Sequence, residues 1–269
     1  MVSIAGEISE PDVSVGRVIG RGLRAVAANP IPVATLAFLF GAAPEMLLVY
    51  ALSKLDVGAF AGLGRGSNLG LLLSILSWVA TSVAFGTLLQ GLLARAMSAD
   101  ALSGRVRELA LLAEALGRAP KLLALGAFTA LCIVAVAPLI VPAVMLCLAW
   151  AVAGPVLAEE GGGSIAALRR SAELTRGVRW RVLGLTLVLF LFSAAGVAVT
   201  GLMGRWLFVD GNSVELAASG AWHPGKLAFD AAALTAVRAV WGAVQAALYG
   251  ELRAAEAEGA PDRLATIFA

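Results

Sequence analysis

Residues Leu122–Ala158 read LLALGAFTALCIVAVAPLIVPAVMLCLAWAVAGPVLA and contain no charged side chain. As one helix, these 37 residues would be roughly 55 Å long, about twice the length needed to cross a ~30 Å hydrocarbon core. The stretch must therefore fold back on itself within a membrane. Pro138 and Pro142 interrupt helical hydrogen bonding, so we expect two antiparallel membrane helices joined by a turn at Leu139–Val141.

The composition of the whole chain agrees with a membrane protein. The 269 residues are 60% hydrophobic and 14% charged, with a mean hydropathy of +0.89, values that are difficult to reconcile with a soluble protein. The formal net charge is only +2, and the basic residues form no single stripe, so nucleic acid is not an expected partner. We expect one polytopic membrane domain over residues 1–269.

Four further apolar segments are long enough to span a bilayer, which with the hairpin predicts six transmembrane helices. The four segments are Ile31–Ser53, Leu69–Ala94, Trp180–Met203 and Leu227–Gly250. Their aromatic ends suit anchoring at the two membrane interfaces, with Trp180 and Tyr249 near one side.

The distribution of Lys and Arg predicts the orientation of these spans. With the N-terminus in the cytoplasm, fifteen Lys and Arg residues fall in cytoplasmic segments. The other side holds four, which are Lys54, Arg65, Arg205 and Lys226, and Arg238 lies within a span. This positive-inside asymmetry predicts that both termini face the cytoplasm.

An amphipathic helix is expected before each odd-numbered span. Apolar and basic side chains separate onto opposite faces in a helix at Val15–Ala28, and Gly104–Arg118 repeats this pattern. A third helix is expected at Ser164–Arg176, with Ser164 as N-cap and Gly177 as its stop. Each is expected to lie on the cytoplasmic surface.

The junctions between these surface helices and the spans suggest an internal repeat. They are Asn29–Pro30, Ala119–Pro120 and Gly177–Val178. We therefore hypothesise a pseudo-threefold bundle of three units, each a surface helix followed by a transmembrane hairpin. The units are residues 13–97, 104–158 and 164–252, followed by a cytoplasmic tail at 253–269.

Ionisable residues at membrane depth are costly and are therefore candidates for function. Glu45 lies in the first predicted span and Arg238 in the sixth, with Asp230 nearer the outer surface. Glu45 and Arg238 are predicted to form an internal ion pair; the alternatives are a polar pathway or substrate site, and independent snorkelling of the two side chains. Gln90 and Gln245 are interpreted as hydrogen-bonding residues between helices.

Motifs for catalysis are absent from the sequence. His223 is the only histidine, and Gly161–Gly163 lacks the lysine and spacing of a phosphate-binding loop. Cys132 and Cys147 lie in the apolar hairpin, where packing is favoured over a disulfide. We expect no enzyme activity, no cofactor and no metal site.

A charged segment follows the apolar hairpin. Its residues are predicted to form a cytoplasmic collar that contacts lipid headgroups, or that only fixes the topology. They are Glu159, Arg169, Arg170, Arg176, Arg179 and Arg181, with Glu159 or Glu160 pairing with Arg169, Arg170 or Arg179.

Part of this segment resembles a known bacterial family. The residues PVLAE at 155–159, ALRRS at 167–171, LTRG at 174–177 and Trp180 are similar to the glycerophosphoryl diester phosphodiesterase membrane domain. The terminal blocks LY at 248–249 and ELR at 251–253 also resemble that family. The resemblance implies a six-helix protein of the bacterial inner membrane without the soluble catalytic barrel, and it assigns no catalytic residue.

Two classes of function remain open. The first is a non-enzymatic inner-membrane protein that scaffolds, assembles or modulates a membrane complex or its lipid environment, with membrane lipids and a membrane-protein complex as partners. The alternative is a transporter or channel for a lipid or small amphiphile, with a polar cavity. Its lining would be Glu45, Gln90, Asp230, Arg238 and Gln245.

Overall fold

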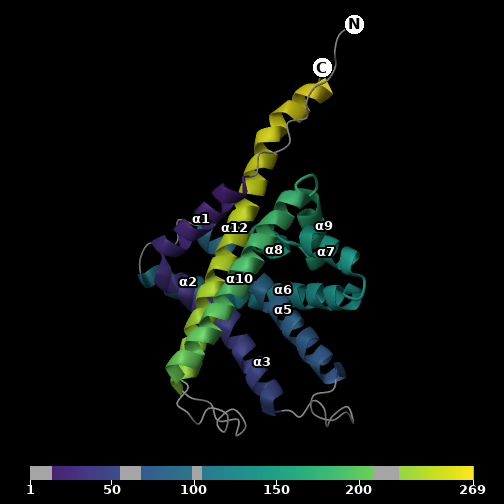
Figure 1. Ribbon diagram of the computed structural model, residues 1–269. Coiled ribbons are helices and arrows are strands. Elements are labelled where there is room, and N and C mark those ends of the chain that lie inside the picture. The colour runs from purple at the N-terminus through teal and green to yellow at the C-terminus, as the bar shows by residue number, and fades with distance from the viewer. Residues whose placement is uncertain (1–13, 55–67, 99–104, 209–223, 269) are drawn as a thin grey trace.

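The computed structural model describes residues 14–54, 68–98, 105–208 and 224–268, and this part of the chain is helical without β-strands (Figure 1). The helices are α1 (Val15–Ala28), α2 (Pro30–Ala37), the π-helix η1 (Phe38–Ala42), α3 (Ala43–Lys54), α5 (Asn68–Ser98), α6 (Arg105–Val136), α7 (Ile140–Ala149), α8 (Ala153–Glu160), α9 (Ser164–Leu174), α10 (Arg179–Phe208) and α12 (Pro224–Phe268).

Six of the described segments are long and apolar enough to cross a membrane, as the sequence predicts. They are Pro30–Ala51, Leu72–Met97, Gly117–Val136, Ile140–Glu160, Arg179–Gly204 and Gly225–Ala257. The first span joins α2, η1 and α3, and the fourth joins α7 and α8. The chain is therefore an integral multi-pass membrane protein.

The longest helix, α12, organises the bundle. It packs against α1, α2, η1, α5 and α10, while α5 also packs against α6 and α8. Figure 1 shows α10 and α12 running obliquely through the molecule and α6 crossing the view at a wide angle to them. The far end of α12 projects beyond the other helices in the same view.

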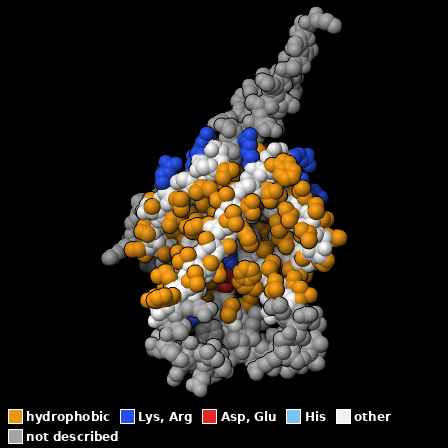
Figure 2. Space-filling model, in the orientation of Figure 1, with side chains coloured by type: hydrophobic (Ala, Val, Ile, Leu, Met, Phe, Trp, Pro, Cys, Tyr) orange, Lys and Arg blue, Asp and Glu red, His pale blue; other side chains and the backbone are white. Residues whose placement is uncertain are grey.

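Charge and hydrophobicity are segregated on the surface. Figure 2 shows a band of hydrophobic side chains across one face, with Lys and Arg side chains gathered along the edge where α1 and α9 lie. We call this edge the basic end, formed by α1, α9, the C-terminal ends of α5 and α8 and the N-terminal end of α10. Such a band bordered by charge is the surface that a bilayer requires.

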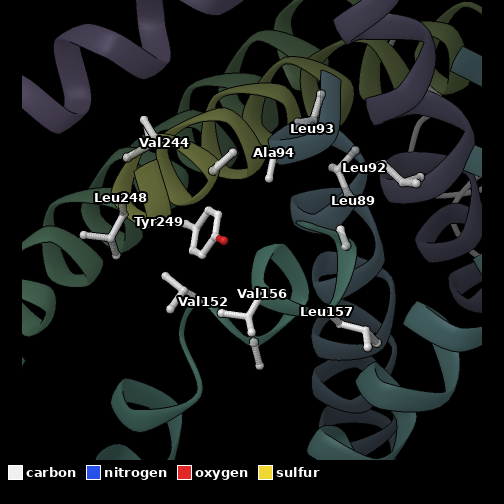
Figure 3. Packing of buried hydrophobic residues seen from close by; sticks show 14 of the residues in the cluster. Leu89, Leu92, Leu93, Ala94, Val152, Val156, Leu157, Val244, Leu248 and Tyr249 are labelled. Carbon is white, nitrogen blue, oxygen red and sulfur yellow. The ribbon is translucent and has the colours of Figure 1, made fainter. Parts of the chain in front are cut away.

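Close packing of small residues holds the buried centre together. Gly154 on α8 lies so close to α5 that a Cβ atom there would overlap the carbonyl oxygen of Thr87. On the facing helix, a Cβ on Gly91 would lie 2.9 Å from the carbonyl oxygen of Gly154. Two glycines thus let α5 and α8 approach backbone to backbone. Both helices also contribute to the buried hydrophobic cluster shown in Figure 3, with Leu89 and Leu93 on α5 and Val156 and Leu157 on α8.

Two of the three expected surface helices are separate elements in the structure. Helix α1 has the predicted bounds, and α9 begins at Ser164 as expected. Gly163, however, occupies the N-cap position, so the predicted cap at Ser164 is wrong by one residue. Gly177 has a φ of 91°, a conformation that favours glycine, and it lies in the turn between α9 and α10.

The expected break between the second surface helix and the third span is wrong. Helix α6 runs without interruption from Arg105 to Val136, with Pro120 inside it. Proline removes one backbone donor, and the remaining helical hydrogen bonds on both sides carry the helix through. The second unit therefore lacks the helix break at Ala119–Pro120 that the repeat hypothesis assumes. The pseudo-threefold arrangement stays a prediction.

The apolar hairpin turns close to the predicted position. Helix α6 ends at Val136 and α7 begins at Ile140, so the turn lies at Ala137–Leu139, two residues earlier than expected. The amide of Leu139 donates to the carbonyl of Val136 at 2.8 Å. Cys132 and Cys147, one on each arm, are free thiols.

Candidate functional site

A π-helical segment in the first span directly precedes the turn that carries Glu45. Helix η1 ends at Ala42, just before α3 carries Glu45 in its first turn. A Cβ on Gly41 would lie 3.1 Å from Cβ and 3.2 Å from Cγ of Arg238. The missing side chain at Gly41 thus lets α12 bring the stem of Arg238 against η1, beside Glu45.

Arg238, Glu45 and Ser82 form a buried polar cluster that we call the core ion pair. The Nε of Arg238 donates to Oε2 of Glu45 at 3.3 Å, and its Nη2 forms an ion pair with Oε1 of the same carboxylate. The Nη2 also lies 2.9 Å from Oγ of Ser82, which donates to Oε1 of Glu45. Glu45 is only 2% exposed.

The core ion pair joins three spans through charge-assisted hydrogen bonds. Glu45 belongs to the first span, Ser82 to the second and Arg238 to the sixth. Opposite charges in a two-point contact neutralise each other, and the serine hydroxyl adds a third link. Ser82 was missed from the sequence, where a serine in an apolar helix is common and gives no signal of its own.

The other polar residues selected from the sequence do not all join this cluster. Asp230 forms an ion pair with Lys226, one turn earlier on α12, and its side chain is 39% exposed. Gln245 is buried, at 4% exposure, and its Oε1 has no hydrogen-bond partner among the described residues. Gln90 is half-buried on α5.

A second polar site supplies hydrogen bonds to the backbone where the helix of the fourth span is interrupted. Helix α7 ends at Ala149 and α8 begins at Ala153. Ser171 of α9 accepts a hydrogen bond from the amide of Val152 at 3.3 Å and donates one to the carbonyl of Ala149 at 2.9 Å. Thr175 donates to the carbonyl of Ala149 at 3.4 Å and to that of Ser171 at 2.9 Å. Both hydroxyl residues are fully buried, so they replace part of the helical bonding that the break removes.

At the basic end, Arg170 connects three helices. Its Nη1 donates to Oε1 of Glu256 on α12 at 2.8 Å, and its Nε donates to Oε2 of Glu160 on α8 at 3.2 Å. The hydrogen bond that Arg170 donates to Glu256 raises the pKa of Arg170 above its already high ordinary value, so the side chain stays charged. Tyr249 of α12 donates to Oε1 of Glu160 at 3.1 Å. We call these four residues the clasp.

Tyr249 lies deeper than the interface position expected for it. Its side chain is 4% exposed, and Figure 3 shows the ring among Val152, Val156, Leu248 and Ala94, with the hydroxyl oxygen directed away from α12. The hydroxyl donates to the carboxylate of Glu160 inside the protein. A tyrosine near the end of a span can lie at the membrane interface, or it can be buried with a hydrogen-bond partner. The sequence alone does not distinguish these two positions.

The remaining charged residues of the predicted collar differ in their exposure and in the contacts described for them. Glu159 forms an ion pair with Arg95 of α5 at 3.6 Å. The predicted pairing of Glu160 with Arg170 is confirmed, with Nε of Arg170 3.2 Å from Oε2 of Glu160. Arg21 of α1 lies 3.0 Å from Glu251 of α12. Arg169 and Arg176 are exposed, and Arg179 and Arg181 are half-buried on either side of Trp180, whose exposure is 78%.

The polar contacts described above are ion pairs and hydrogen bonds within residues 14–54, 68–98, 105–208 and 224–268. In these ranges no group of three or more His, Cys, Asp and Glu residues could hold a metal ion. Comparison with known proteins finds no family model, no curated protein and no solved structure that matches the chain.

Proposed function

We propose that the chain is a non-enzymatic membrane protein that scaffolds, assembles or modulates a membrane complex or its lipid environment. One observation carries the proposal: the charges at membrane depth, Glu45 and Arg238, bind each other and Ser82. Each charge is neutralised by the other inside the protein, and this arrangement favours a rigid helix bundle.

The clasp supports the same interpretation. Arg170 holds the end of the fourth span and the projecting part of α12 at once, through Glu160 and Glu256. Together with Ser171 at the break, these contacts fix the relative positions of α8, α9 and α12 at the basic end. A fixed surface is what a docking partner needs, because little entropy is lost when it binds.

A transporter would use the same residues differently. It needs polar side chains that line a cavity, whereas Asp230 pairs with Lys226 on its own helix and Glu45 is closed off by Arg238. Transport would therefore require the core ion pair to open. We place this function second.

The arginines outside the clasp suit contact with anionic lipid headgroups. Arg169 and Arg176 are exposed, and the exposed ring of Trp180 marks the membrane interface beside them. Each near-surface arginine contributes about 1 kcal/mol to binding of an anionic membrane. Lipids, and a membrane-protein complex, are the partners we propose.

The proposal places the protein in the bacterial inner membrane with both termini in the cytoplasm, so that the basic end is cytoplasmic. The resemblance to the glycerophosphoryl diester phosphodiesterase membrane domain is part of the same proposal. Reporter fusions to the C-terminus, active only in the cytoplasm or only in the periplasm, test the orientation directly.

Affinity purification of the tagged protein from its native membrane in a mild detergent tests the function. Mass spectrometry then measures the co-purifying proteins and the retained lipids. A stoichiometric protein partner is the expected result. A lone protein that retains one lipid class would overturn the scaffold and favour lipid binding or transport.

A matched pair of variants separates specific from general effects in that experiment. Arg169→Gln removes an exposed arginine next to the clasp, whereas Arg170→Gln removes the arginine that orders it. If the co-purifying protein is lost only from the Arg170→Gln variant, the result indicates that this protein docks at the clasp. Equal loss in both indicates that charge at this surface matters more than its geometry.

A further inference from the structure

Four polar residues lie on one face of α12, from the membrane interior to the basic end. Arg238, Gln245, Tyr249 and Glu256 are separated by 7, 4 and 7 residues. At 3.6 residues a turn, the intervals from Arg238 correspond to about 1.9, 3.1 and 5.0 turns, so all four side chains leave the helix in nearly the same direction. Helix α12 thus carries a polar stripe on a mostly apolar helix.

Three members of this stripe have a partner on another helix. Arg238 binds Glu45, Tyr249 binds Glu160, and Glu256 binds Arg170. Gln245 is the exception, since its Oε1 is buried without a hydrogen-bond partner among the described residues. A buried acceptor left without a donor costs about 1 to 3 kcal/mol, and such atoms in native proteins are usually bonded to protein or to internal water.

The neighbours of Gln245 supply the second contact that an internal water needs. Gln245 and Tyr249 are four residues apart, so their side chains are adjacent on the helix surface. The hydroxyl of Tyr249 donates to Glu160 and keeps lone pairs free to accept a hydrogen bond. One water molecule placed between the two side chains can therefore donate to both oxygens, within the two to four bonds typical of buried water.

We propose that Gln245 and Tyr249 hold internal water, which enters from the basic end beside the clasp. The ligand is water because the site offers two neutral acceptors, Gln245 Oε1 and the Tyr249 hydroxyl, and neither attracts an anion. Glu160 and Arg170 lead from this site to the surface. The site brings solvent to within two helical turns of the core ion pair.

Hydroxyl-radical footprinting with a short X-ray pulse in water enriched in oxygen-18 tests the proposal on the intact protein. Radicals form from water at the site, so a buried side chain is oxidised when bound water touches it. Tyr249 is expected to be modified despite its 4% exposure. Leu125 on α6, at 0% exposure, is the dry control, and Trp180, at 78%, is the exposed control.

The variant Gln245→Leu removes the acceptor and, unlike a methionine at this position, does not compete strongly with Tyr249 for hydroxyl radicals. We expect several-fold less modification of Tyr249, unchanged modification of Trp180, and a melting temperature equal to or lower than that of the unaltered protein. Tyr249 as unreactive as Leu125 in the unaltered protein would overturn the proposal. A higher melting temperature in the variant, with Tyr249 labelling unchanged, would overturn it as well, because it shows that a dry, unpaired amide was removed.

Discussion

The Nε of Arg238 lies 3.3 Å from Oε2 of Glu45, across 193 positions of sequence and between the sixth and first spans. The contact closes the bundle, since it ties the last span to the first inside the membrane. Helix α12 also packs along α1, α2 and η1. The ion pair and this packing therefore act at the same interface.

Breaking the core ion pair is expected to be strongly destabilising. Glu45→Arg or Arg238→Glu places two like charges side by side in the buried cluster, and the free energy of unfolding is expected to fall by at least about 3 to 5 kcal/mol. The double variant that carries both Glu45→Arg and Arg238→Glu should recover a large part of this lost stability. Thermal unfolding in detergent, followed by fluorescence-detected size exclusion, measures the effect.

The pair Lys226–Asp230 provides the matched control for that swap. It lies on the same helix, with side-chain exposures of 51% and 39%. Exposed pairs are typically worth about 0 to 1 kcal/mol, so reversing either charge or both should leave the melting temperature nearly unchanged. A double swap of Glu45 and Arg238 no more stable than the single variants would contradict direct pairing.

Removing the hydroxyl of Ser171 is expected to loosen the break in the fourth span. Ser171→Ala leaves the amide of Val152 and the carbonyl of Ala149 without this partner, at a cost of about 1 to 3 kcal/mol. Ser193→Ala is the control, because Ser193 donates only to Leu189 within its own helix. Hydrogen exchange at Val152 should accelerate in the first variant and not in the second.

Conservative replacement of Arg170 tests the geometry of the clasp. Arg170→Lys keeps the charge but cannot bind Glu160 and Glu256 as a planar fork. Because its neighbours raise the pKa of Arg170, the contact to Glu256 should not weaken as pH rises through the neutral range.

Distances between spin labels report whether the clasp is closed. Labels at the exposed positions Ala166 on α9 and Ala254 on α12 are expected to show a broader distance distribution in Arg170→Lys than in Arg169→Lys. High salt should broaden the distribution in the unaltered protein, since these charges are partly exposed and salt screens them. Equal distributions in both variants would argue against a role for the fork.

The close approach of α5 and α8 predicts a strong effect of a single methyl group. In Gly154→Ala the new Cβ overlaps the backbone of Thr87, so the two helices must separate, at a cost of about 1 to 3 kcal/mol. Gly184 on α10 has open space at its Cβ position, so Gly184→Ala should be neutral or slightly stabilising. A comparable loss in melting temperature for both variants would show that helix propensity, rather than packing, controls the result.

The spans were predictable from the sequence because hydropathy over about 20 residues is a strong physical requirement of the bilayer. Glu45 and Arg238 stood out for the same reason, as charges in apolar surroundings. Proline was a weaker guide: Pro138 marks the turn of the hairpin, whereas Pro120 lies within the continuous helix α6. The loss of one backbone hydrogen bond at a proline does not end a helix when the neighbouring helical hydrogen bonds remain.

The finer parts of the site depend on contacts that local sequence does not encode. Trp150–Val152 contains neither glycine nor proline, yet the fourth span breaks there. The polar contacts at this break come from Ser171, a residue of α9 that is 19 positions away from Val152. Glu159 pairs with Arg95 of α5, because the packing of α5 against α8 brings together charges that are far apart in the sequence.

The hydroxyl groups that repair the fourth span impose an order on biosynthesis. Ser171 and Thr175 follow α8 along the chain, so they emerge from the ribosome after the broken span has been made. Until α9 docks, the amide of Val152 and the carbonyl of Ala149 lack this partner, and water at the basic end must serve in its place. The fourth span therefore reaches its final state only when the helix translated after it arrives.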